Sequence, residues 1–211
     1  MTKRLKPLEV SYDFVAVIDG LPADERKNWK TSDSLIHFLT ENGIEQLLSL
    51  CNDKNMLLQS LEYFEKLAGN GKKFCLHIIC HGNSEGIGLK ATNERIKWKE
   101  FREKLSIINK LMNQSLIVNM TSCFGLHGIK IVDEHSTDYP FFGLIGPSQK
   151  IGVKRADRIN KLFYSKQLEG KQVQEIVKEI NKEIGTEQIY CISSEGYKAI
   201  KNYLHKNKNT V

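Results

Sequence analysis

The stretch Phe74-Cys75-Leu76-His77-Ile78-Ile79-Cys80-His81-Gly82 carries the strongest structural signal in the chain. Its apolar run is short and rich in branched residues, and it ends at a glycine, which predicts a strand buried on both faces of a sheet. A second stretch of this kind, Ser115-Leu116-Ile117-Val118-Asn119-Met120, predicts another buried strand and leads to Cys123. Each predicted strand is therefore followed by a side chain that can do chemistry, His81 after the first and Cys123 after the second.

Strands and helices alternate along most of the remaining chain. We expect further strands at 13–19, 44–51, 86–89 and 141–145, and an edge strand at 189–192. The segment 44–51 also fits a helix, but the Asn-Asp turn after it favours a strand. Apolar residues at helical spacing predict helices at 32–43, 54–68, 98–111, 153–168, 173–184 and 195–205, whereas 22–31 reads as a polar stretch. This alternation predicts an α/β fold, a three-layer sandwich in which helices cover both faces of a mostly parallel sheet.

Length and charge point to one globular domain. A chain of 211 residues suits a single domain over 1–211, with short polar tails at about 1–9 and 206–211. The net charge is +6, but the lysines are spread along the chain and toward its two ends, which is typical of solvated surface. Aromatic residues do not alternate with basic ones, so we expect no direct nucleic-acid partner. The glycine-rich segment 82–88 lacks the Lys-Ser or Lys-Thr of a phosphate-binding loop, which disfavours a nucleotide site.

The cysteine pattern suggests a reducing compartment. The chain has five cysteines, an odd number, and no Cys-x-x-Cys pair. Three of them, Cys51, Cys75 and Cys80, lie in apolar runs, where a reduced cysteine behaves as a small hydrophobic residue. Residues 1–9 do not resemble a signal peptide, and no apolar run is long enough to cross a membrane. We therefore expect a cytoplasmic protein with reduced thiols, no metal site, no cofactor and no membrane contact.

A cysteine–histidine pair is the chemistry that these strand ends favour. A lone cysteine or histidine after a strand is more often structural, but His81 and Cys123 would lie at one edge of the sheet if their strands are parallel neighbours. Gly82 allows a sharp turn that leaves its backbone N–H free, and with the N–H of Cys123 it could hold an oxyanion. Gly125 frees the loop around the cysteine.

The other histidines are weaker candidates for this pair. His77 lies within its strand and is expected to face the core or a helix. His127 could compete as a base, but it is too close to Cys123 along the chain to align easily. No partner pattern accompanies the remaining three, which are His37, His135 and His205.

Two blocks of the sequence resemble those of caspase-like cysteine peptidases. Residues 74–87 resemble their His-Gly block, in which an apolar strand runs into His-Gly and a Gly-Ile follows. Residues 115–125 resemble their nucleophile block, although Thr121 stands where caspases have Gln. Residues further along the chain narrow the resemblance to the CHAT subgroup. They are Phe142-Gly143-Leu144-Ile145-Gly146-Pro147, Ala156, Phe163-Tyr164, Leu168-Glu169-Gly170-Lys171 and Val173. In all, the resemblance covers roughly residues 10 to 185.

The resemblance implies peptide-bond hydrolysis through a thioester on Cys123, with His81 protonating the leaving amine. It calls for no third residue to orient the histidine, and the sequence offers no clear candidate. In this group the residue two before the nucleophile lines the substrate pocket, which assigns substrate binding to Thr121. Asp19, or Asp24 and Glu25 after it, could add negative charge there or simply cap a loop. A basic or small residue before the cut is the resulting expectation.

Two features of the resemblance bear on partners. CHAT-like domains often act as effectors triggered by a sensor, in prokaryotic defence or cell death, so we expect a protein or peptide substrate and a regulatory protein. Many domains keep a fold and lose its chemistry. The alternative is therefore a catalytically silent interaction module with the caspase fold.

Overall fold

A six-stranded sheet forms the centre of the computed structural model, which describes residues 11–83, 85–120, 123, 125–132, 136–185 and 188–208. Its strands lie in the order β2-β1-β3-β7-β8-β9, and all are parallel except β9, which pairs antiparallel with β8 at one edge. Their bounds are β1 (Phe14–Asp19), β2 (Gln46–Leu50), β3 (Phe74–Ile79), β7 (Ile117–Met120), β8 (Gly143–Pro147) and β9 (Ile189–Ile192). The predicted mostly parallel sheet and its edge strand are confirmed.

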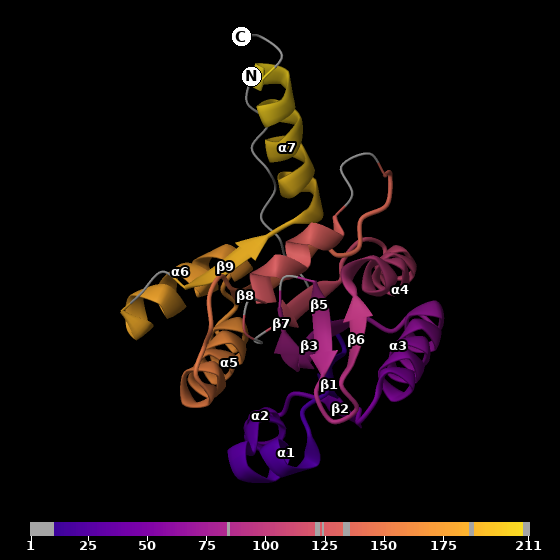
Figure 1. The fold of residues 1–211 in the computed structure, drawn as a ribbon. Helices are drawn as coiled ribbons and strands as arrows, with labels where there is room; N and C mark the ends of the chain where they lie inside the picture. Colours follow the sequence, from indigo (N-terminus) through magenta and orange to yellow (C-terminus); the bar gives the residue numbers. More distant parts are fainter. Residues whose placement is uncertain are drawn as a thin grey trace.

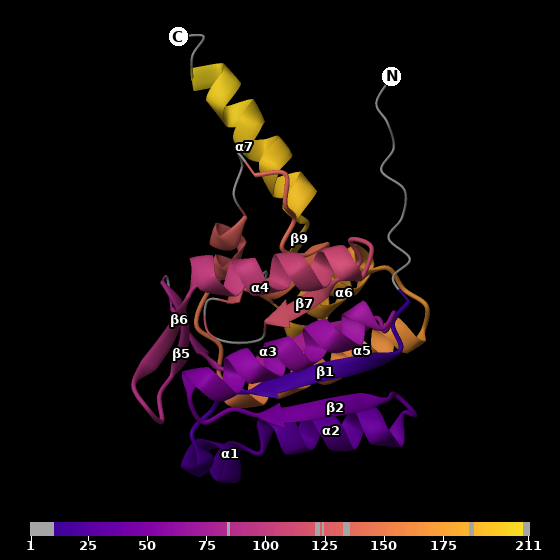
Figure 2. The same cartoon turned by 90° about the vertical axis from the view of Figure 1, so that its right-hand side faces the viewer.

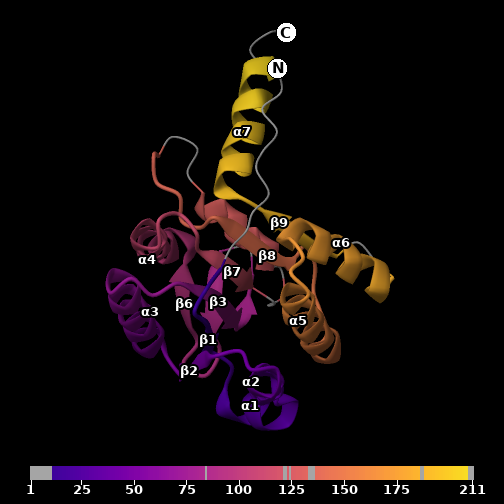
Figure 3. The ribbon, with the colours of Figure 1, turned by 180° about the vertical axis from the view of Figure 1, so that it is seen from behind.

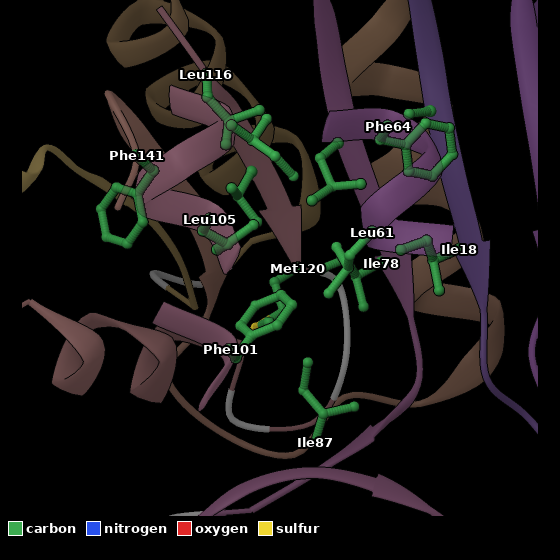
Figure 4. Close-up of a cluster of buried hydrophobic side chains, with 14 of the residues drawn as sticks. Ile18, Leu61, Phe64, Ile78, Ile87, Phe101, Leu105, Leu116, Met120 and Phe141 are labelled. Carbon is green, nitrogen blue, oxygen red and sulfur yellow. The ribbon is translucent and has the colours of Figure 1, made fainter. Parts of the chain in front are cut away.

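Helices cover both faces of this sheet, which gives the three layers expected. Helices α3 (Lys54–Gly69) and α4 (Trp98–Leu111) lie on one side, while α2 (Thr31–Glu41), α5 (Val153–Leu168) and α6 (Val173–Ile184) lie on the other (Figures 1 and 2). Successive strand residues point to opposite faces, so β1, β3, β7 and β8 each contribute side chains to both cores. Figure 4 shows the core under α3 and α4, where Ile78 and Met120 of the sheet meet Leu61 and Phe101 of the helices.

The helix bounds follow from caps and apolar spacing. Asp53 accepts a hydrogen bond from the Met56 N–H at 2.8 Å and so caps the first turn of α3. Leu57, Leu61 and Phe64 then recur at helical spacing and are buried. The predictions for 98–111, 153–168 and 173–184 match α4, α5 and α6 at both ends.

A small antiparallel sheet lies beyond the carboxyl end of β3. It consists of β4 (His81–Gly82), β5 (Gly86–Leu89) and β6 (Glu94–Lys97), of which the sequence predicted only β5. Gly86 allows the close pairing of β5 with β6, because a Cβ there would lie 2.1 Å from the Ile96 carbonyl oxygen. This sheet therefore fixes His81 as part of a strand rather than in an open turn.

Three further elements complete the fold. Residues 22–31, expected to be polar loop, contain the helix α1 (Ala23–Trp29), which lacks an apolar stripe, and the 3-10 helix η1 (Gly125–Ile131) follows β7. Helix α7 (Ser194–Lys208) projects away from the sheet, as Figure 3 shows from behind. Its base is attached where the Ser194 hydroxyl donates to the Phe141 carbonyl at 2.6 Å. Across the described part of the chain, no helix combines the length and apolarity that a membrane crossing requires.

Candidate active site

The sheet brings His81 and Cys123 to the same edge. Strands β3 and β7 are parallel neighbours, and their last aligned pair is Ile78 with Met120. His81 and Cys123 each lie three residues beyond that pair. Neighbouring strands are only about 4.8 Å apart. The condition that the sequence set for a cysteine–histidine pair, adjacent parallel strands, is therefore met.

The imidazole of His81 lies in a cradle made by two other elements. Its Nε2 is 2.5 Å from Oε2 of Glu25, on α1. The Trp29 ring, also on α1, meets the imidazole edge to face with 6.0 Å between ring centroids. From the other side, His81 is paired with Gly88 of β5. The Glu25 carboxylate, the Trp29 ring and the pairing of β4 with β5 together restrict the orientation of this histidine.

Glu25 also forms an ion pair with Lys90. Its side chain is only 10% exposed, and its Oε1 accepts a hydrogen bond from the Lys90 ammonium group at 2.6 Å. Burial alone raises the pKa of Glu25, but the hydrogen bonds from Lys90 and His81 outweigh burial and lower the pKa overall. Glu25 is therefore an ionised carboxylate at neutral pH and bridges α1 to the end of β5.

Cys123 lies half-buried in the turn that follows β7. Its thiol donates to the carbonyl oxygen of Ile151 at 3.8 Å, and in the described structure it makes no hydrogen bond to His81. Gly125 brings the chain back against β7, because a Cβ on it would lie 1.9 Å from the Met120 carbonyl oxygen. Gly146 of β8 is also close to this turn, because a Cβ on it would lie 2.8 Å from the carbonyl carbon of Gly125 and 2.9 Å from the Met120 carbonyl oxygen. Gly125 and Gly146 are thus both in close backbone contact with the end of β7.

The backbone N–H of Gly82 points away from β5. Asn83 donates from its N–H to the Gly86 carbonyl, so this pair is a hydrogen-bonded one in the β4–β5 ladder. Such pairs alternate with non-hydrogen-bonded ones, and Gly82 with Ile87 is the next pair along. Since β4 is the outer strand of its sheet, the Gly82 N–H faces the open edge. The predicted oxyanion donor is therefore not used by the ladder.

The predicted substrate-binding carboxylate at Asp19 has a structural position instead. Its side chain lies at the end of β1 with 0% exposure, where it accepts from the Leu21 N–H at 2.9 Å and from the Ser32 hydroxyl at 2.5 Å. Burial raises its pKa, against those two hydrogen bonds. A carboxylate enclosed in this way has no surface to offer a substrate. Thr121, the other predicted pocket residue, lies outside the described residues.

The other described histidine side chains, His37, His77 and His127, lie on α2, β3 and η1. His77 is fully buried in β3, and its Nδ1 is 2.9 Å from the Tyr164 hydroxyl on α5, as expected for a histidine facing a helix. Burial lowers the pKa of His77 to about 3, so the ring is neutral. His37 lies on the surface of α2, 3.3 Å from Glu41, and His127 lies on η1. His135 and the side chain of His205 are outside the described residues.

All five cysteines are free thiols. Cys51, Cys75 and Cys80 are buried, as their apolar surroundings predicted. Burial raises the pKa of each of these thiols, to about 12 for Cys75, and it does the same for Cys191. Among the described side chains no group of three potential ligands could hold a metal ion.

Glu25 is the residue of this site whose contact was not foreseen. The sequence suggested it only as a source of negative charge, whereas the structure places it against His81, 56 positions away along the chain. No motif marks such a contact, because it depends on a short helix without apolar periodicity. Comparison of the chain with models of known protein families and with curated proteins found no match.

Proposed function

We propose that this chain is a cysteine endopeptidase of the caspase-like type, nearest to the CHAT subgroup. The observation that carries the proposal is the register of β3 and β7, which delivers a histidine and a cysteine to equivalent positions beyond two neighbouring parallel strands. The resemblance of residues 74–87 and 115–125 to the blocks of those peptidases supports the same reading.

The reaction uses the pair in two steps. The sulfur of Cys123 attacks the peptide carbonyl carbon as its proton passes to His81, and the oxyanion is held by the N–H groups of Gly82 and Cys123. His81 then gives that proton to the amine nitrogen as the C–N bond breaks, which leaves a thioester. In the second step His81 takes a proton from water as the oxygen attacks the thioester. The C–S bond then breaks, the Cys123 thiolate takes the proton back from His81, and the carboxylic acid product is released.

A partner that completes the site is part of this proposal. The resting thiol of Cys123 is directed to the Ile151 carbonyl, not to the imidazole of His81. Catalytic hydrogen bonds often form only in the substrate complex. We therefore expect an effector that a regulatory or sensor protein switches on, in the manner of defence or cell-death peptidases.

Labelling by peptide electrophiles tests the proposal directly. The probes carry Arg, Lys, Asp or Leu before the reactive group, and the variants are Cys123→Ala and His81→Ala in the full chain. The proposal expects one labelled peptide containing Cys123, no labelling in Cys123→Ala, and slower labelling in His81→Ala. The buried thiols supply an internal control, since a probe that reaches them reports unfolding.

The opposite result would favour the interaction module. If no probe labels Cys123, with or without a candidate regulatory protein from the same genetic neighbourhood, and His81→Ala changes nothing, the chain has the fold without the chemistry. Binding of that regulatory protein, measured by calorimetry on wild type and Cys123→Ala alike, would then define a non-catalytic function.

A further inference from the structure

The side chains of His81, Glu25 and Lys90 contact one another in series. His81 contacts Glu25 at 2.5 Å, and Glu25 contacts Lys90 at 2.6 Å. We propose that Glu25 is a positioning residue that sets which nitrogen of His81 carries the proton, with Lys90 fixing the orientation of its carboxylate. This inference rests on the proposed chemistry of Cys123 and His81, and it adds a third member that the resemblance does not supply.

Glu25 determines the tautomer because it can only accept hydrogen bonds. An ionised carboxylate has no proton to donate, and the hydrogen bonds from Lys90 and His81 keep Glu25 ionised. The Nε2 of His81, at 2.5 Å from Oε2, must therefore carry the hydrogen. A neutral imidazole has one N–H and one lone pair, so the lone pair lies on Nδ1. Nδ1 is then the nitrogen that can take the proton of the Cys123 thiol.

Lys90 restricts Glu25 to one arrangement of its two oxygens. The ammonium group is a donor only, and it occupies Oε1 while His81 occupies Oε2. Lys90 follows β5, whose Gly88 pairs with His81 itself. The hairpin therefore places the cation and the histidine on the two sides of one carboxylate. The Lys90 side chain is 64% exposed, so it can be replaced without opening the core.

The Glu25→Gln variant separates positioning from packing. The amide keeps the shape of the carboxylate but presents one acceptor and one donor group. Lys90 requires the acceptor, so the amide oxygen turns toward it and the NH₂ group faces Nε2 of His81. Nε2 must now accept, which moves the ring proton to Nδ1. The histidine then presents an N–H to the thiol and cannot act as its base, the wrong-tautomer defect known for an Asp-to-Asn change in a serine peptidase triad.

Removing Lys90 should relieve this defect. In the double variant Glu25→Gln/Lys90→Met no cation demands the amide oxygen, so the amide can turn over and accept from Nε2 again. Lys90→Met alone leaves Glu25 as an acceptor and should therefore be mild. A purely structural role for these residues predicts the reverse, since losing two contacts should then do more damage than losing one.

The experiment measures alkylation of Cys123 by iodoacetamide near pH 7, resolved by peptide mass spectrometry, in the full chain and in each variant. We expect Glu25→Gln to slow alkylation by about 10-fold to 100-fold, the loss typical when the hydrogen-bond partner of a metal-ligating histidine is removed. Lys90→Met should change the rate by no more than about 3-fold, because exposed ion pairs are weak. The double variant should react faster than Glu25→Gln. Glu41→Gln, which removes the carboxylate from the exposed His37–Glu41 pair on α2, is the matched control and should react like wild type.

Imidazole ¹⁵N shifts of His81 provide a second readout that does not involve the cysteine. Wild type should show the proton on Nε2, and Glu25→Gln should show it on Nδ1. The same tautomer in both proteins, or a double variant slower than Glu25→Gln, would overturn the positioning role. A third outcome separates the two proposals. If His81→Ala leaves alkylation unchanged, but the His81 tautomer still differs between wild type and Glu25→Gln, the proposed Cys123–His81 chemistry fails and the role of Glu25 toward His81 stands.

Discussion

Gly125→Ala is the substitution whose effect can be worked out most directly from the structure. A Cβ at this position would lie 1.9 Å from the Met120 carbonyl oxygen and 3.2 Å from Cδ of Pro147. Favourable contacts begin near 3.5 Å, so the loop must move by more than about 1 Å, and both obstacles belong to strand ends in the sheet. Overpacking of this kind costs about 1–3 kcal/mol. For a chain of this length each kcal/mol lowers the melting temperature by roughly 2–4 °C.

The displacement should affect chemistry more than stability. Cys123 lies two residues before Gly125, and a misplacement of about 1 Å in a reacting group can cost 100-fold in rate. The assay combines a thermal melt with the rate at which the peptide electrophile labels Cys123. We expect Gly125→Ala to melt a few degrees lower than wild type, and its Cys123 to be labelled at least about ten times more slowly.

Gly69→Ala is the matched control for this prediction. Gly69 is the last residue of α3, and a Cβ there would meet nothing within 4 Å. Alanine is favoured over glycine in a helix by up to about 1 kcal/mol, so this variant should be as stable as wild type or slightly more so. If the two variants melt and label alike, the tight closure of the loop over Gly125 is refuted.

Two further predictions concern pH and the core. The contacts of Glu25 lower its pKa, so its carboxyl group binds a proton less readily in the folded state than in the unfolded chain. Glu25 therefore stabilises the fold at pH values above its usual pKa of 4.5, and this contribution is lost as the pH falls below 4.5. Urea unfolding of wild type and Glu25→Gln at pH 7 and pH 3 should show a smaller acid-induced loss in the variant, and an equal loss would contradict the ion contacts. Phe101→Ala empties a buried position in the core under α4 and should lower the free energy of unfolding by about 3–5 kcal/mol in the same assay, whereas a loss below about 1 kcal/mol would mean that the ring is not packed as described.

The sequence predicted those elements whose apolar residues repeat with a clear period. The helix 153–168 and the strand at residues 74–79 are of this kind, because each buries one stripe or a whole run of side chains. The neighbouring positions of His81 and Cys123 followed from the preference of such strands for a parallel sheet. Helix α1 escaped prediction because Glu25 is its only buried residue, so no apolar period exists to detect.

The carboxylates show where sequence reasoning about the site fails. Asp19 and Glu25 looked alike as acidic residues near the end of the first strand, yet one is enclosed by Ser32 and the Leu21 N–H, and the other contacts His81. What separates them is the path of the chain after β1, which a polar segment does not encode in its spacing. A contact between side chains distant along the chain becomes visible only when the fold is known.

The packing around Cys123 also has a consequence for synthesis of the protein on the ribosome. Gly125 lies against Gly146, and the Cys123 thiol is turned to the Ile151 carbonyl. Those supporting residues are translated after the cysteine, and a nascent chain emerges and folds from its N-terminus at about 5–20 residues per second. For an interval of seconds Cys123 is therefore present without Gly146 and Ile151, the residues that contact its turn in the folded protein. A nascent or prematurely terminated chain that stops before β8 would carry Cys123 but not its geometry, so the proposed peptidase chemistry would have to wait until most of the domain has emerged.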